Sequence, residues 1–174
     1  ERCQVRQMSL IDELGQVSHV FSDKTGTLTL GKPQVTDILA RGETDDEVLR
    51  LAASVEQFSE HPLGAALEAS AKERGLQLSK VTDFQSAPGL GVRADVDGEA
   101  ITVGSMKLAA QAQVTMGGPA VTAARVLAEQ GKTPMVVLRG EELLGLLAVA
   151  DTVRAESAEA VSQLEALGID VVML

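Results

Sequence analysis

Two short apolar runs stand at opposite ends of the chain, and each is typical of a buried β-strand. The first, Val17 to Ser22, ends at a polar loop that contains glycine, Asp23 to Gly31. The second, Ile169 to Leu174, follows a helical stripe that ends at Gly168. Because the residues between them mix helical and strand-like patterns, the sequence predicts an α/β domain in two pieces with an α+β domain inserted between them.

The inserted region is expected to be an antiparallel sheet flanked by helices. Capping residues, Pro62 and glycines predict helices over residues 44–57, 62–75 and 119–130, and a further helix is expected over 153–167. A strand is expected over Gln34 to Leu39. Two hairpins are expected to turn at Asp97-Gly98 and at Arg139 to Glu142.

Charge and composition exclude several classes of partner. With 15 Lys and Arg against 25 Asp and Glu, the net charge is −10, which repels nucleic acid phosphates and anionic lipids alike. The only aromatic residues are three phenylalanines, which excludes the stacking platform that single-stranded nucleic acids need. No run reaches the roughly 18 apolar residues of a membrane-spanning helix. A single cysteine, Cys3, permits no internal disulfide and favours a reducing compartment.

The loop after the first strand carries a candidate nucleophile. Asp23-Lys24-Thr25-Gly26-Thr27-Leu28-Thr29 places a carboxylate at the carboxyl end of a strand, where open α/β sheets bind ligands. A cation, hydroxyls and a glycine that lets backbone N–H groups approach an anion stand beside it. Such a carboxylate can attack a phosphoryl group when a divalent metal offsets the repulsion between the two anions. The alternative is a turn that only caps the loop.

The string DKTGTLT resembles the signature of P-type ATPases, ion and lipid pumps that store the energy of ATP as an aspartyl phosphate. The resemblance implies that Asp23 is phosphorylated, that Asp23 and the Thr25 carbonyl hold Mg²⁺, and that Lys24 and Thr27 contact phosphoryl oxygens. It also implies a haloacid-dehalogenase-like phosphorylation domain. Related phosphatases carry a second Asp where this chain has Thr25, and a hydroxyl is a poor general base. The aspartyl phosphate is therefore expected to persist.

A second motif lies in the inserted region. Ser59-Glu60-His61-Pro62-Leu63-Gly64, with Glu56 five residues before the histidine, is similar to the nucleotide-binding motif of heavy-metal-transporting P-type ATPases. A histidine at a helix start can stack on adenine or donate an N–H, and Glu56 can accept from the exocyclic amine or orient the imidazole. A histidine that only caps the helix is the alternative reading of the residue taken alone. By the same resemblance, Gly89 and Gly91 line the ATP pocket.

Some segments depart from the heavy-metal pattern. Asp12 to Val17 looks more like the approach to the motif in phospholipid flippases, which makes a phospholipid the alternative cargo. Gly104-Ser105 stands where the metal pumps usually have Gly-Asn, so one polar contact is expected to be shorter or lost. Asp151-Thr152-Val153-Arg154 resembles the return into the phosphorylation domain.

Taken together, the sequence predicts an incomplete haloacid-dehalogenase-like phosphorylation domain, residues 1–36 and 149–174, with a nucleotide-binding domain, residues 37–148, inserted into it. The expected function is the ATP-binding and phosphorylation region of a pump for copper, zinc or a similar cation. The chain is expected to be an excised, cytoplasmic fragment that binds ATP or ADP and turns over little without the remaining domains of the transporter. A soluble phosphatase with an aspartate nucleophile and a non-catalytic nucleotide-binding module are the alternatives.

Overall fold

A computed structural model describes residues 19–22, 29–59, 61–112, 114, 116–153 and 155–173. Contacts divide the chain into two compact units, the smaller made of residues 1–32 and 151–174 and the larger of residues 33–150. The strands β2 (Thr29–Ala40) and β7 (Glu142–Val153) belong partly to each unit. No helix among the described residues is both long and apolar enough to cross a membrane.

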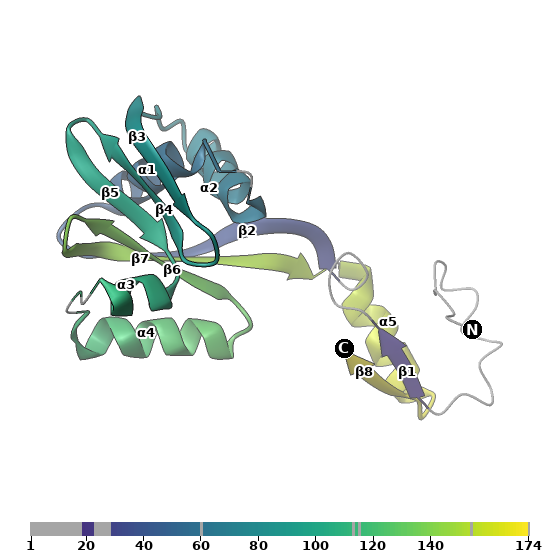
Figure 1. Ribbon diagram of the computed structural model, residues 1–174. Helices are drawn as coiled ribbons and strands as arrows, with labels where there is room; N and C mark the ends of the chain where they lie inside the picture. The colour runs from purple at the N-terminus through teal and green to yellow at the C-terminus, as the bar shows by residue number, and fades with distance from the viewer. Residues whose placement is uncertain are drawn as a thin grey trace. The chain divides into compact units, whose positions relative to one another are not determined.

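The larger unit is built on a six-stranded sheet in the order β2-β7-β6-β5-β4-β3 (Figure 1). Its remaining strands are β3 (Val81–Ala87), β4 (Gly91–Val96), β5 (Glu99–Gly104) and β6 (Thr133–Arg139). Consecutive pairs from β3 to β7 are antiparallel. The predicted antiparallel sheet is therefore confirmed, and so are both of its hairpins.

Two pairs of helices cover the two faces of this sheet (Figure 1). The pair on one face is α1 (Asp45–Glu56) and α2 (Pro62–Glu73), and the pair on the other is α3 (Met106–Gln111) and α4 (Gly117–Glu129). Neighbouring residues of β6 face opposite cores, since Val137 packs with the first pair of helices and Val136 with the second. Because both faces of β6 are buried, its sequence is a continuous apolar run and does not alternate between apolar and polar residues.

Local signals account for the two helices of the first pair. The Thr44 side chain accepts a hydrogen bond from the backbone N–H of Glu47 at 3.2 Å, as the predicted capping box requires. Pro62 occupies the first turn of α2, and Gly75 follows the helix with φ of +70°. Both predicted helices are confirmed to within two residues.

Several predicted boundaries were wrong. Thr29 to Gly31 were expected in a loop but begin β2, and Pro33 is tolerated within that strand because β2 is an edge strand. Val153 was expected in a helix but ends β7. The short helix α3 was not predicted, since six residues are too few to show a helical period.

The smaller unit joins the two ends of the chain. Strand β1 (His19–Ser22) pairs in parallel with β8 (Asp170–Met173), with His19 opposite Asp170. The helix α5 (Ala155–Ala166) precedes β8, and its Leu164 packs with Ile169. Parallel pairing of strands from opposite ends confirms the prediction that both ends contribute to one α/β sheet.

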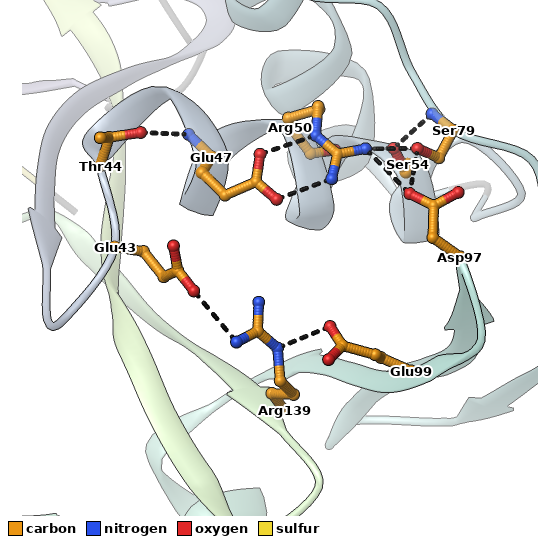
Figure 2. A network of polar contacts seen from close by, with 9 residues as sticks. All are labelled: Glu43, Thr44, Glu47, Arg50, Ser54, Ser79, Asp97, Glu99 and Arg139. Atoms are coloured by element: carbon orange, nitrogen blue, oxygen red, sulfur yellow. Dashed lines mark hydrogen bonds and ion pairs between the residues drawn. The ribbon is translucent and has the colours of Figure 1, made fainter.

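A polar network connects α1 to the loop before β3 and to the β4–β5 turn (Figure 2). The Arg50 guanidinium donates two hydrogen bonds to Glu47, at 2.8 and 2.7 Å, and also bonds Ser79 and Asp97. The arginine keeps the pKa of Glu47 below its usual range. Ser54, which is fully buried, accepts from the Ser79 backbone N–H at 3.0 Å. These bonds hold the loop before β3 in place.

Candidate functional site

The residues predicted to bind nucleotide lie on two segments of the larger unit. Glu56 ends α1 and His61 caps the start of α2, whereas Gly89 and Gly91 lie in and just after the turn that joins β3 to β4. A ring contact between Phe58 and Phe84 links the first segment to β3, with centroids 5.9 Å apart. The segment between Glu56 and His61 therefore packs against β3, the strand that leads into the turn with Gly89.

Glu56 is a buried carboxylate with unused hydrogen-bonding capacity. Its side chain is only 4% exposed, and Oε2 has no hydrogen-bond partner among the described residues. Burial raises the pKa of Glu56, while a hydrogen bond from Ser59 and the nearby His61 oppose that rise. A buried acceptor without a partner is costly, and a ligand that donates to Oε2 would remove the cost.

His61 performs the capping role that was the alternative for this residue. Its Nδ1 accepts a hydrogen bond from the backbone N–H of Leu63 at 3.2 Å. Because Nδ1 is an acceptor there, the neutral ring carries its proton on Nε2. The residue is exposed, so capping fixes the ring and leaves the opposite edge available as a donor to a ligand.

Gly64 explains how α2 approaches the end of α1 so closely. A β-carbon added to Gly64 would lie 2.9 Å from Oε2 of Glu56 and 3.1 Å from the Glu56 carbonyl oxygen. The glycine at the end of SEHPLG therefore makes room for the buried carboxylate. Sequence reasoning did not assign this role to Gly64, although a glycine in the first turn of a helix was a visible signal.

The two glycines of the β3–β4 turn differ in their surroundings. Gly89 has φ of +74°, and nothing lies within 4 Å of an added β-carbon. A β-carbon on Gly91 would instead lie 2.2 Å from the Val103 carbonyl oxygen and 2.5 Å from the Gly104 Cα. Gly91 and Gly104 are opposite each other across β4 and β5. The missing side chain of Gly91 is therefore required by strand packing, whereas Gly89 borders open space.

Ser105 directly follows Gly104, the residue that pairs with Gly91. Its backbone N–H donates to the Leu90 carbonyl at 2.7 Å. Its Oγ is buried and has no hydrogen-bond partner among the described residues, and it does not cap α3. The position at which the resemblance predicted an asparagine thus holds a hydroxyl that can still form hydrogen bonds.

Asp151 of the smaller unit joins the end of the DKTGTLT string to the returning chain. Its Oδ2 accepts from the Thr29 hydroxyl and from the Gly31 N–H at 3.2 Å, and its Oδ1 accepts from the Lys32 N–H at 3.0 Å. The sequence placed Asp151 in a return motif, and this clamp on the backbone was not foreseen.

The predicted phosphorylation residues lie outside the part of the chain that the structure describes: Asp23, Lys24, Thr25 and Thr27. The expected Mg²⁺ ligands, Asp23 and Thr25, are among them. Within the described ranges, no group of three or more His, Cys, Asp and Glu residues could hold a metal ion. The roles of these four residues therefore stay predictions.

Comparison with known proteins decides the family. The profile of the haloacid dehalogenase-like hydrolases matches residues 17–174. The chain belongs to the haloacid dehalogenase-like hydrolase family. Pumps are among the proteins similar to it: the copper-exporting P-type ATPase of Bacillus subtilis is 40% identical over 165 residues, which cover 94% of this chain and 20% of the pump. The predicted resemblance to heavy-metal P-type ATPases is thereby confirmed.

Solved structures of heavy-metal P-type ATPases are also similar to this chain. A zinc-transporting PIB-type ATPase in the E2.Pi state is 35% identical, with a TM-score of 0.79 over 95% of this chain and 26% of that structure. The N-domain of HMA6, a copper-transporting P-type ATPase, is 28% identical, with a TM-score of 0.56 over 67% of this chain and 96% of that domain. The chain spans about a fifth of the length of the curated relatives it matches. These likenesses disfavour a free-standing phosphatase and a phospholipid cargo.

Proposed function

We propose that this chain is the ATP-binding and phosphorylation region of a P-type ATPase that exports a heavy-metal cation, on the cytoplasmic side of the membrane. The observation that carries the proposal is the buried Glu56 carboxylate beside the N-capping His61, because its Oε2 has no hydrogen-bond partner in the described part of the chain. The copper and zinc pumps among the similar proteins support a cation of that class as the cargo.

In this proposal the larger unit binds the nucleotide. The exocyclic amine of adenine donates to Oε2 of Glu56, and this contact would favour adenine over guanine, because guanine presents a carbonyl oxygen at that position. The Nε2–H of His61 donates to the nucleotide, and the open side of Gly89 admits the sugar or phosphates next to the backbone. Gly91 contributes by holding β4 against β5.

The smaller unit supplies the acceptor of the phosphoryl group. A carboxylate oxygen of Asp23 forms a bond to the γ-phosphorus, the bond from that phosphorus to the bridging oxygen breaks, and ADP leaves with the electron pair. Asp23 and the Thr25 carbonyl would hold Mg²⁺, which supplies positive charge that offsets the repulsion between the two anions. Lys24 and Thr27 would stabilise the phosphoryl oxygens, and the remaining domains of the pump are the partners.

Calorimetric titration of the 174-residue chain with ADP and ATP tests nucleotide binding. His61→Gln and Glu56→Gln are each expected to weaken binding, and GTP is expected to bind more weakly than ATP to the wild-type chain. Equal affinity of wild type and both variants would contradict the assigned pocket.

Labelling with radioactive ATP tests the phosphorylation step. Little acyl phosphate is expected on this chain alone, and strong labelling is expected on a longer chain that continues past Leu174. Asp23→Asn in the longer chain should abolish the hydroxylamine-sensitive label. A label that survives this substitution would reject Asp23 as the nucleophile, and a longer chain that binds ATP without labelling would favour a non-catalytic nucleotide-binding module.

A further inference from the structure

Phe58 is a large aromatic side chain that lies mostly at the surface. It is 55% exposed, in the loop between Glu56 and His61. The neighbouring apolar positions of α1, such as Val55, are completely buried. A large apolar ring held at the surface between two proposed ligand residues marks a place where an apolar partner can bind.

Phe84 supports the Phe58 ring from β3. The two rings are 5.9 Å apart with an angle of 47° between their planes, a tilted arrangement that aromatic pairs favour. Phe84 is half-buried and packs on the core beneath α1 and α2. The contact therefore fixes the Phe58 ring against the sheet while leaving much of its surface open.

An irregularity in β3 brings Phe84 to this position. Thr82 pairs with Asp95 and Gln85 with Arg93, so two residues of β3 stand opposite the single residue Ala94 of β4. Asp83, within this bulge, has φ of +51°, which is uncommon for a residue other than glycine.

The bulge changes which side chain faces the helices. In a regular strand, Asp83 would share a face with Val81, because side chains alternate with a period of two. The extra residue instead places Phe84 beside Val81 against the core. Strained backbone that persists at such a place is typical of a functional site.

We propose that Phe58 is the surface on which the nucleotide base stacks, with Phe84 as the residue that positions it. The inference rests on the proposed nucleotide-binding function and adds a recognition element to it. An amine that donates to Oε2 of Glu56 lies in the plane of the base, so the contact by itself leaves both faces of the base without an apolar partner. The Phe58 ring, two residues further along the chain, supplies that partner for one face.

Titration of the whole 174-residue chain with ADP tests the proposal. Phe58→Ala should weaken ADP binding about tenfold, the size of a typical loss of base stacking on an aromatic residue. Phe58→Tyr keeps the ring face and should retain wild-type affinity. Leu39→Ala removes a comparably exposed apolar side chain from β2 and serves as the control, with no expected change. The loss should be of equal size for AMP and ATP, because the contact is with the base.

A direct readout separates stacking from a merely structural role. In the wild-type complex with ADP, nuclear Overhauser effects are expected between Phe58 ring protons and the protons of adenine. Thermal unfolding should show Phe58→Ala folded, and Phe84→Leu should weaken ADP binding less than Phe58→Ala does.

The outcomes distinguish this inference from the function on which it rests. If His61→Gln weakens ADP binding while Phe58→Ala binds like wild type, the stacking role is wrong and the nucleotide site stands. If the wild-type chain binds no adenine nucleotide, both are overturned. Absence of contacts between the Phe58 ring and adenine in a complex that does form also rejects the proposal.

Discussion

Oε2 of Glu56 lies 2.9 Å from the point that a β-carbon on Gly64 would occupy, so the buried carboxylate is closed in by the first turn of the next helix. This enclosure removes water from Oε2 and leaves it without a partner among the described residues. A charge in such a place destabilises the fold. A destabilising charge of this kind is retained in evolution when it serves binding.

Glu56→Gln should stabilise the fold at neutral pH while it weakens nucleotide binding. Burial raises the folded-state pKa of Glu56, so its stabilising effect is complete below the unfolded-state pKa and is lost as the pH rises through the folded-state value. Glutamine has no carboxyl group that ionises, so the variant does not lose stability as the pH rises through this value. Urea unfolding between about pH 8 and pH 4 should show an advantage of the variant that shrinks as the pH falls. Glu73→Gln, at an exposed position of α2, is the control. A variant less stable than wild type at neutral pH would contradict the prediction.

Alanine at Gly89 and at Gly91 should have different consequences. At Gly91 the β-carbon meets the backbone of β5, and we expect a loss of about 3 kcal/mol or more in unfolding free energy. At Gly89 only the positive φ is unfavourable, and the expected loss is about 1 kcal/mol. Chemical denaturation measures both values.

Gly98→Ala provides a matched control for Gly89→Ala. Gly98 also has a positive φ, of +87°, with nothing within 4 Å of an added β-carbon, but it lies in the β4–β5 turn. Both variants should lose similar stability, and only Gly89→Ala should bind ADP more weakly. Identical ADP affinity in the two would exclude Gly89 from the nucleotide site.

Ser54→Ala should lower the unfolding free energy by about 1 kcal/mol, the usual cost of an orphaned hydrogen-bond donor. The Ser54 hydroxyl donates to the Arg50 carbonyl at 2.7 Å and accepts from the Ser79 N–H, so its removal releases the loop from α1 (Figure 2). Urea unfolding gives the value, and Ser86→Ala, at an exposed position of β3, should cost less. Equal stability of the two variants would show that the network does not hold the loop.

Asp151→Asn should loosen the start of β2 without weakening ADP binding. An amide has one acceptor oxygen in place of two, so at least one of the bonds from Thr29, Gly31 and Lys32 is lost. Hydrogen exchange at the Gly31 and Lys32 amides should become faster. Glu156→Gln, on an exposed position of α5, should leave both rates unchanged. Unchanged hydrogen-exchange rates in Asp151→Asn would show that the Asp151 carboxylate does not hold the start of β2 in place.

Much of the framework could be predicted because its signals are local. The bond from Thr44 to Glu47, the proline in the first turn of α2 and the turn at Asp97-Gly98 each depend on residues within a few positions of one another. The strings around Asp23 and His61 identified the family for the same reason, since each motif is continuous in the sequence.

The tertiary structure alone decided the features that join distant residues. The burial of Glu56 depends on how α2 folds back on α1, and the need for glycine at position 91 depends on the backbone of Gly104. The bulge that turns Phe84 toward Phe58, and the clamp from Asp151 to Thr29, leave no mark in any short window of sequence. The physical reason is that capping and turn energies act between chain neighbours, whereas desolvation and close packing depend on whatever segment the fold brings alongside.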